Sequence, residues 1–212
     1  MTDKPIIFSA PMVRALLAGT KTQTRRILKP QPPEWVTRMT HEGRCGWIGS
    51  GDGHGTLMHA PCAVGDRLWV REALICATEN MGKFASFADV VCYAEDGSTA
   101  LREFQMVNWP WKRETLNVRF MPRWASRLTL IVTDVRVQRV QSITEADAVE
   151  EGVSPISEPD DRKWEHYAPH GVAFRALWNS LHGPGAWDAN PWVAALTFTV
   201  HRQNIDQMEP TK

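Results

Sequence analysis

The chain has no surplus of either charge, because its 24 Lys and Arg residues balance its 24 Asp and Glu residues. This balance excludes binding of nucleic acid by bulk electrostatic attraction, so any such contact must come from a local basic patch. The chain also lacks an apolar run near the roughly 20 residues that a membrane-spanning helix requires. We therefore expect no membrane partner.

Cysteine is scarce, and no two cysteines form a closely spaced pair. The four cysteines are Cys45, Cys62, Cys76 and Cys92. Together with an amino terminus that has no apolar signal segment, this spacing predicts reduced thiols in a cytoplasmic protein. The segment from 41 to 62 also contains His41, His54 and His59, which are zinc-type ligands. Their spacing matches no usual zinc pattern, so we favour a loop without metal.

Tyrosine is nearly absent, with two residues against ten tryptophans. Tryptophan serves both core packing and the stacking of nucleobases. We expect Trp178 and Trp192 to pack in the core, because they lie on the apolar faces of a predicted helix and strand. Trp69 is a candidate for base stacking. Three more tryptophans leave both roles open: Trp109, Trp111 and Trp124.

Short apolar segments with strand periodicity dominate the rest of the chain. We expect strands at 4–8, 67–72, 89–93, 127–140 and 192–201, with a slip of the buried face near Thr133 and Asp134. Helices are predicted after Ser9, around 174–181, and from Thr144 to Gly152, where Thr144 and Asp147 form a capping-box pattern. The segments at about 34–60, 95–125 and 155–190 look like insertions in a single domain. These features predict an α+β, mainly β fold, namely a small closed or nearly closed β-barrel with two or three flanking helices.

The stretch Gly19-Thr20-Lys21-Thr22-Gln23-Thr24-Arg25-Arg26 concentrates an amine, hydroxyls and guanidinium groups directly after a predicted helix. A threonine hydroxyl is a poor nucleophile unless a nearby base accepts its proton, and a neutral lysine amine can do so. Burial, or the adjacent Arg25 and Arg26, would lower the pKa of Lys21 enough for that role. In the competing interpretation Lys21, Arg25 and Arg26 form a basic edge exposed to solvent, and the threonines are present only because they favour strand structure.

Three features in this order resemble the ASCH domain of the PUA-like superfamily. They are Gly-x-Lys-Thr-x-Thr-x-Arg at 19–26, Gly-Asp-x-Leu-x-Val at 65–70, and a long strand leading to Ile-Thr-Glu-x-x-Ala-x-x-Glu-Gly at 143–152. With Asn190-Pro191-Trp192-Val193 near the end, the chain is similar to the long ASCH proteins of bacterial viruses and prophages. The resemblance implies a PUA-like β-barrel and a role with RNA or nucleosides, without a cofactor.

Small members of that family are similar to amidohydrolases that remove the acetyl group from N(4)-acetylcytidine. By this resemblance the catalytic group is Lys21, Thr24 and Glu151, with Arg26 holding the substrate. The alternative for Glu151 is a surface residue in the last turn of a short helix. Arg25 stands where the small members carry an apolar residue.

Glu72, which follows the Gly-Asp strand, also departs from the small members, and it is a secondary candidate for the pocket carboxylate. Its alternative role is pairing with Arg71 or Arg136. Two functions stay open: an amidohydrolase acting on an acylated pyrimidine nucleoside or base, and a non-enzymatic module that binds RNA or a modified nucleotide.

Overall fold

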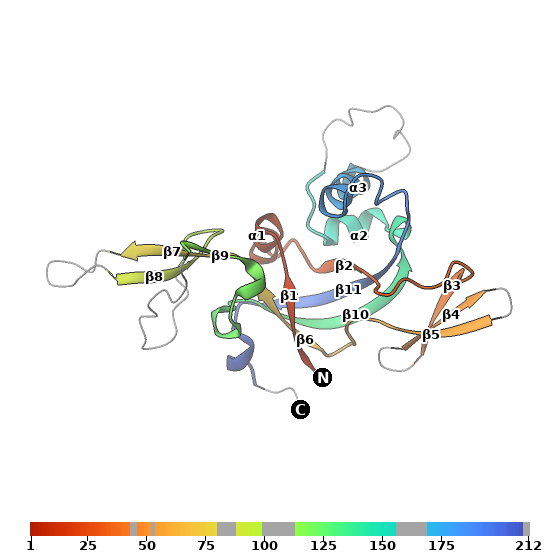
Figure 1. Cartoon of the computed structure of the whole chain (residues 1–212), viewed down its shortest axis with the longest axis horizontal. Helices are drawn as coiled ribbons and strands as arrows, with labels where there is room; N and C mark the ends of the chain where they lie inside the picture. The colour runs from red at the N-terminus through yellow and green to blue at the C-terminus, as the bar shows by residue number, and fades with distance from the viewer. Residues whose placement is uncertain (43–45, 52–53, 80–87, 99–112, 156–168, 210–212) are drawn as a thin grey trace. The chain divides into compact units, whose positions relative to one another are not determined.

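The computed structural model describes residues 1–42, 46–51, 54–79, 88–98, 113–155 and 169–209 (Figure 1). These residues form a mixed α+β fold that consists mostly of strands, with three α-helices in the described part. The helices are α1 (Ala10–Ala18), α2 (Glu145–Glu150) and α3 (Pro169–His182). The strands are β1 (Asp3–Ile7), β2 (Gln23–Ile27), β3 (Arg38–Glu42), β4 (Gly46–Gly51), β5 (His54–His59), β6 (Arg67–Arg71), β7 (Leu74–Glu79), β8 (Ala88–Tyr93), β9 (Thr115–Leu116), β10 (Thr129–Arg139) and β11 (Trp192–His201).

The chain folds into two compact units, each built from separate segments. Apart from Met1, the first unit consists of Ala18–Asp66 and Val132–Thr199. The second unit consists of Thr2–Leu17, Arg67–Ile131 and Val200–Lys212. The long strand β10 belongs to both units, because its first three residues lie in the second and the others in the first.

The largest sheet has five strands in the order β1-β6-β10-β11-β2, and β1 and β2 are its two edges. β1 pairs with β6 in parallel, and β11 pairs with β2 in antiparallel register. The described sheets are not closed into a barrel, so the predicted closed or nearly closed barrel is wrong. Alternating apolar residues specify one buried face, and an open sheet covered by helices buries that face just as well.

Several expected elements are confirmed. Strands β1, β6, β8, β10 and β11 and all three helices lie where the periodicity predicts them. The alternation of buried residues along β10 shifts by one position, as expected. Leu130 and Val132 are buried, and Val135 is the next buried residue. The two residues between, Thr133 and Asp134, are exposed. In α2 the predicted capping box is present, with the Thr144 hydroxyl accepting from the Asp147 amide.

The segment at 34–60 contains regular structure that the sequence pattern did not indicate. Strands β3, β4 and β5 form an antiparallel three-stranded sheet there. Strand β7, outside this segment, is another strand that the sequence pattern did not indicate. Glycine and histidine are common in loops, and pairing between backbones leaves no periodic mark on such a sequence. In the described structure the segment expected to be an insertion at 34–60 therefore contains a small sheet.

Helices α2 and α3 lie together over one face of β2 and β11 in the first unit (Figure 1). Phe174 and Trp178 of α3 pack with Trp187, Ala148 of α2 and Val193 of β11 in a buried apolar cluster. Trp178 and Trp192 are 2% and 5% exposed, so their predicted packing in the core is confirmed. No described helix is long and apolar enough to cross a membrane.

The last residue of β4 has no room for a side chain. A Cβ built on Gly51 would lie 1.9 Å from the carbonyl oxygen of Trp35, which is backbone and cannot rotate away. We expect Gly51→Ala to lower the free energy of unfolding by about 1–3 kcal/mol, as overpacking does. The measurement is urea denaturation monitored by tryptophan fluorescence.

The matched control is Gly55→Ala in β5, where the nearest atom to the added Cβ is 3.8 Å away. The free energy of unfolding of this variant is expected to lie within about 0.5 kcal/mol of the wild-type value, as for most surface substitutions. Equal stability of the two variants would contradict the packing of β4 against Trp35.

Candidate functional site

Residue 21 lies in the first unit, in a short connection between a helix-ending glycine and an edge strand. Gly19 has a φ of 76°, a left-handed conformation that glycine adopts without steric cost. Directly after Lys21, the Thr22 amide donates to the Glu150 carbonyl at 2.8 Å and the Thr22 carbonyl accepts from the Phe198 amide at 2.9 Å. The backbone around Lys21 is therefore held between the end of α2 and β11.

The Lys21 ammonium is completely buried and bonded twice to Glu151. Its Nζ donates to the Glu151 side chain at 2.7 Å and to the Glu151 carbonyl at 2.8 Å. Lys21 is 0% exposed and Glu151 is 4% exposed. Glu151 is the C-terminal cap of α2, directly after its last residue, so the lysine also satisfies a carbonyl at the helix terminus. The alternatives of a solvated basic edge and a surface glutamate are wrong for these two residues.

Arg25 joins the same carboxylate from β2. Its Nη1 donates to Glu151 Oε1 at 3.1 Å and to Gln23 Oε1 at 2.7 Å. Its Nη2 lies 2.9 Å from Asp147 Oδ2, an ion-pair distance without hydrogen-bond geometry. The guanidinium carbon is 5.7 Å from the centre of the Phe174 ring. Arg25, 3% exposed, is thus held between two carboxylates and an aromatic ring.

Asp147 is the second anionic centre of this network. Its Oδ1 accepts from Arg136 at 2.8 Å and from Gln23 at 3.2 Å, while its backbone and other oxygen complete the capping box with Thr144. Burial opposes ionisation of Asp147, but the Arg136 hydrogen bond, the Thr144 amide and the charge of Arg25 lower its pKa to about 2. Asp147 is therefore ionised across the neutral range.

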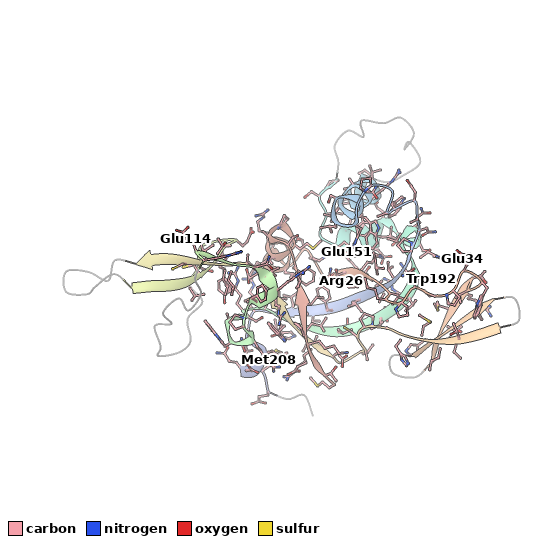
Figure 2. All side chains as sticks on the ribbon, in the orientation of Figure 1. Arg26, Glu34, Glu114, Glu151, Trp192 and Met208 are labelled. Carbon is pink, nitrogen blue, oxygen red and sulfur yellow. The ribbon has the colours of Figure 1, made fainter. Side chains whose placement is uncertain are left out.

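Burial lowers the pKa of Lys21 from its ordinary value, and this effect outweighs the opposing attraction of Glu151. The positive charges of Arg26 and Arg25 lower it further. Burial also lowers the pKa of Arg26, again against the attraction of Glu151. Figure 2 shows Arg26 and Glu151 where β2 meets the helices. A lysine whose charged form is disfavoured can lose its proton nearer to neutral pH, which a catalytic base requires.

Thr24 lies on β2, is 2% exposed and pairs with Leu196 of β11. Neighbouring residues of a strand point to opposite faces, so Thr24 and Arg26 face away from Gln23 and Arg25. Lys21 precedes the first strand residue, and alternation therefore does not determine its direction. The structure brings together Lys21, Arg25 and Glu151, and strand alternation assigns Thr24 to the other face of β2.

Glu72 and Trp69 belong to the second unit and have other contacts there. Both oxygens of Glu72 accept from Arg127, at 2.9 and 2.7 Å, rather than from the expected Arg71 or Arg136. Burial raises the pKa of Glu72 despite this pairing. Trp69 is 6% exposed, and the Arg71 guanidinium carbon lies 4.4 Å from the centre of its ring.

The remaining candidates from the sequence are the other tryptophans and the possible metal ligands. Trp109, Trp111 and Cys45 are not among the described residues. Trp124 is half-buried against the apolar cluster around Leu74. Among the residues that the structure describes, no group of three or more His, Cys, Asp or Glu side chains is arranged to hold a metal ion.

Sequence reasoning missed the roles of Gln23 and Asp147 in this network. Asp147 was assigned only to the capping box, and Gln23 had no role at all. The i, i+2 spacing of Gln23 and Arg25 was the one available signal, and it indicates a shared face only once a strand is assigned.

No family model matches the chain, and no curated protein or solved structure is significantly similar to it.

The low pKa of Asp147 makes stability depend on pH in the acid range. Because its folded pKa of about 2 lies below the ordinary carboxyl value of 3.8, its stabilisation is complete above pH 4 and is lost as the pH falls toward 2. We expect Asp147→Asn to lower the free energy of unfolding by about 2 kcal/mol at pH 7. The difference from wild type should shrink between pH 4 and pH 2, measured by urea denaturation.

Asp188→Asn is the matched control, because that side chain is 66% exposed and meets Arg175 at 3.3 Å. It should leave stability nearly unchanged at every pH. A constant deficit of Asp147→Asn from pH 7 to pH 2 would contradict the assigned pKa.

The buried pair of Lys21 and Glu151 predicts a large, non-additive effect on stability. Glu151→Gln leaves the Lys21 ammonium without a counter-charge and should cost about 3–5 kcal/mol. In the double variant Lys21→Met/Glu151→Gln no ammonium is stranded, so its cost should be smaller than the sum of the single costs by about 0.5–3 kcal/mol. A double-mutant cycle by urea denaturation measures this coupling.

Glu150→Gln serves as the control on the same helix, since Glu150 is exposed and accepts from Gln23 at 2.9 Å. It should show little coupling to Lys21→Met. Simple additivity in the Glu151 cycle would mean that the two groups do not interact as described.

Proposed function

We propose that this protein is an amidohydrolase that removes an acyl group from the exocyclic amine of a cytidine-type nucleoside or base, with N(4)-acetylcytidine as the model substrate. The observation that carries the proposal is the Lys21 amine, fully buried, 2.7 Å from Glu151 and with a lowered pKa. A lysine in such surroundings is suited to accept a proton from a hydroxyl.

The proposed reaction has two steps. Neutral Lys21 takes the hydroxyl proton of Thr24 while the Thr24 oxygen attacks the acyl carbon. The C–N bond then breaks, the proton passes to the exocyclic nitrogen, and the acyl group stays on Thr24 as an ester. Water hydrolyses this ester, releasing the carboxylic acid and restoring the threonine. Glu151 orients Lys21 and relays the proton, and Arg26 holds the substrate.

The fold supports this proposal only in that it holds the polar residues on regular secondary structure. An open sheet with two helices over one face holds the polar network on regular elements, where side-chain geometry is best defined. We propose the finer assignment, a PUA-like ASCH architecture, on the motif resemblance at 19–26, 65–70 and 143–152.

The test is incubation with N(4)-acetylcytidine and a panel of related amides, followed by mass detection of the deacylated product. We expect turnover by wild type and a loss of about 100-fold or more in Thr24→Ala, typical of a removed nucleophile or base. Thr133→Ala, a change at an exposed position of β10, is the control and should retain full activity. Absence of turnover with every amide of the panel would refute the proposed amidohydrolase activity.

The lowered pKa of Lys21 sets the direction of the pH dependence. Because only the neutral amine is a base, kcat should rise as the pH increases through the Lys21 pKa. Arg25→Gln removes a positive charge that lowers this pKa, so the rise should move to higher pH. A pH–rate profile of both proteins measures the shift, and a move to lower pH would contradict the role of Lys21.

The second candidate is a non-enzymatic module that binds RNA or a modified nucleotide. Strand alternation favours it, since Thr24 is directed away from the face that carries Gln23 and Arg25. Lys21→Arg separates the two functions. Arginine keeps the positive charge but cannot act as a neutral base, so an enzyme loses turnover whereas a phosphate-binding module retains most of its affinity.

A further inference from the structure

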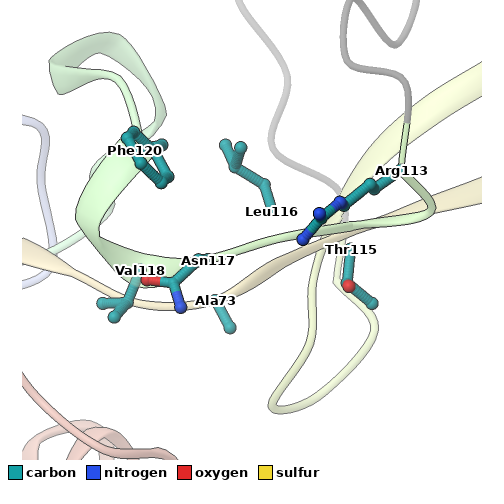
Figure 3. Close-up of a pocket in the computed structure, with 7 residues that line it drawn as sticks. All are labelled: Ala73, Arg113, Thr115, Leu116, Asn117, Val118 and Phe120. Atoms are coloured by element: carbon teal, nitrogen blue, oxygen red, sulfur yellow. The ribbon is translucent and has the colours of Figure 1, made fainter.

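A pocket of about 730 Å³ lies in the second unit, apart from the residues of the proposed reaction. It is formed by the segment from Arg113 through β9 to Phe120, with Ala73 just before β7 (Figure 3). β9 pairs with β7 through Leu74 and Leu116. The volume is in the range of pockets that hold small molecules.

Phe120 is the most conspicuous side chain of this pocket. It is 71% exposed, the highest value among the large apolar side chains that the structure describes as exposed. Its neighbour Met121 is 1% exposed and Leu116 is 6% exposed, and both belong to the core cluster of this unit. The Phe120 amide donates to the Asn117 carbonyl at 2.9 Å. The ring is thus presented to solvent by a turn that is anchored on both sides.

The polar groups of the pocket are a guanidinium and a side-chain amide. Arg113 is exposed, and its side chain extends into the pocket on the side away from Phe120 (Figure 3). Asn117 accepts from the Arg119 amide at 3.0 Å through its side-chain oxygen, and its side-chain nitrogen is a donor group of the pocket lining. Arg119, also exposed, adds a second positive charge to the same turn.

We propose that this pocket binds a nucleotide. An exposed aromatic ring provides a stacking platform for a planar base, and stacking does not require a particular base. The Arg113 guanidinium matches the geometry and charge of a phosphate. The Asn117 amide is placed to donate to an acceptor on the base or the sugar. This site requires none of the Lys21 chemistry.

The test uses two probes, cytidine monophosphate and a fluorescein-labelled single-stranded RNA 8-mer. Isothermal calorimetry serves for the first and fluorescence anisotropy for the second. We expect Phe120→Ala to weaken binding about tenfold or more, the range of a lost stacking interaction. Phe120→Trp should retain affinity, and Phe120→Leu, which keeps apolar area without an aromatic face, should lose it. Arg113→Gln should weaken binding and reduce its dependence on salt.

The matched controls are Leu57→Ala and Arg38→Gln, which change an exposed apolar and an exposed basic residue of the first unit. Both should bind like the wild type. Loss of affinity for both probes in Phe120→Ala supports a site for single nucleotides, and loss for the 8-mer alone supports a site for one nucleotide of a chain. Unchanged binding in Phe120→Ala and Phe120→Leu overturns the proposal. So does a wild type that binds neither probe, or one that only self-associates through Phe120 in sedimentation.

Discussion

The interaction on which the first unit depends is the burial of the Lys21 charge against Glu151. Removing an ammonium from water costs several kcal/mol unless an anion and further hydrogen bonds replace the lost hydration. Glu151 supplies both a carboxylate and a carbonyl, at 2.7 and 2.8 Å. The connection before β2 is thereby tied to the end of α2, two segments separated by 130 residues.

The same interaction determines what chemistry the site can perform. A buried lysine beside one carboxylate and two arginines has a lowered pKa, because burial and like charge both oppose protonation. Arg25 and Lys21 share the Glu151 carboxylate, each bound to a different oxygen, and Asp147 in turn pairs with Arg25. A structural ion-pair network and a proton-accepting lysine are therefore compatible in one cluster. What separates an enzyme from a binding module here is the approach of the Thr24 hydroxyl to that amine.

Sequence patterns predicted those helices and strands that are determined by residues close together in the chain. Alternation along β10 and β11 and the capping box of α2 each depend on residues a few positions apart. Strands β3, β4 and β5 depend instead on backbone pairing across glycine-rich segments, such as Gly49 opposite Met39, and no periodic pattern marks such pairs. Barrel closure could not be predicted either, because it depends on which edge strands meet, and β1 and β2 are both edges.

The sequence alone determined that Lys21, Thr24, Arg25 and Glu151 were the residues to consider, since their chemistry and the motif around them were visible in the chain. Tertiary structure decided which of them meet. Long-range folding buried Lys21 and Arg25 around Glu151, brought in Gln23 and Asp147, and placed Glu72 with Arg127 in the other unit. The physical reason is that these contacts join residues 55 to 130 positions apart in the chain, and local periodicity does not encode such contacts.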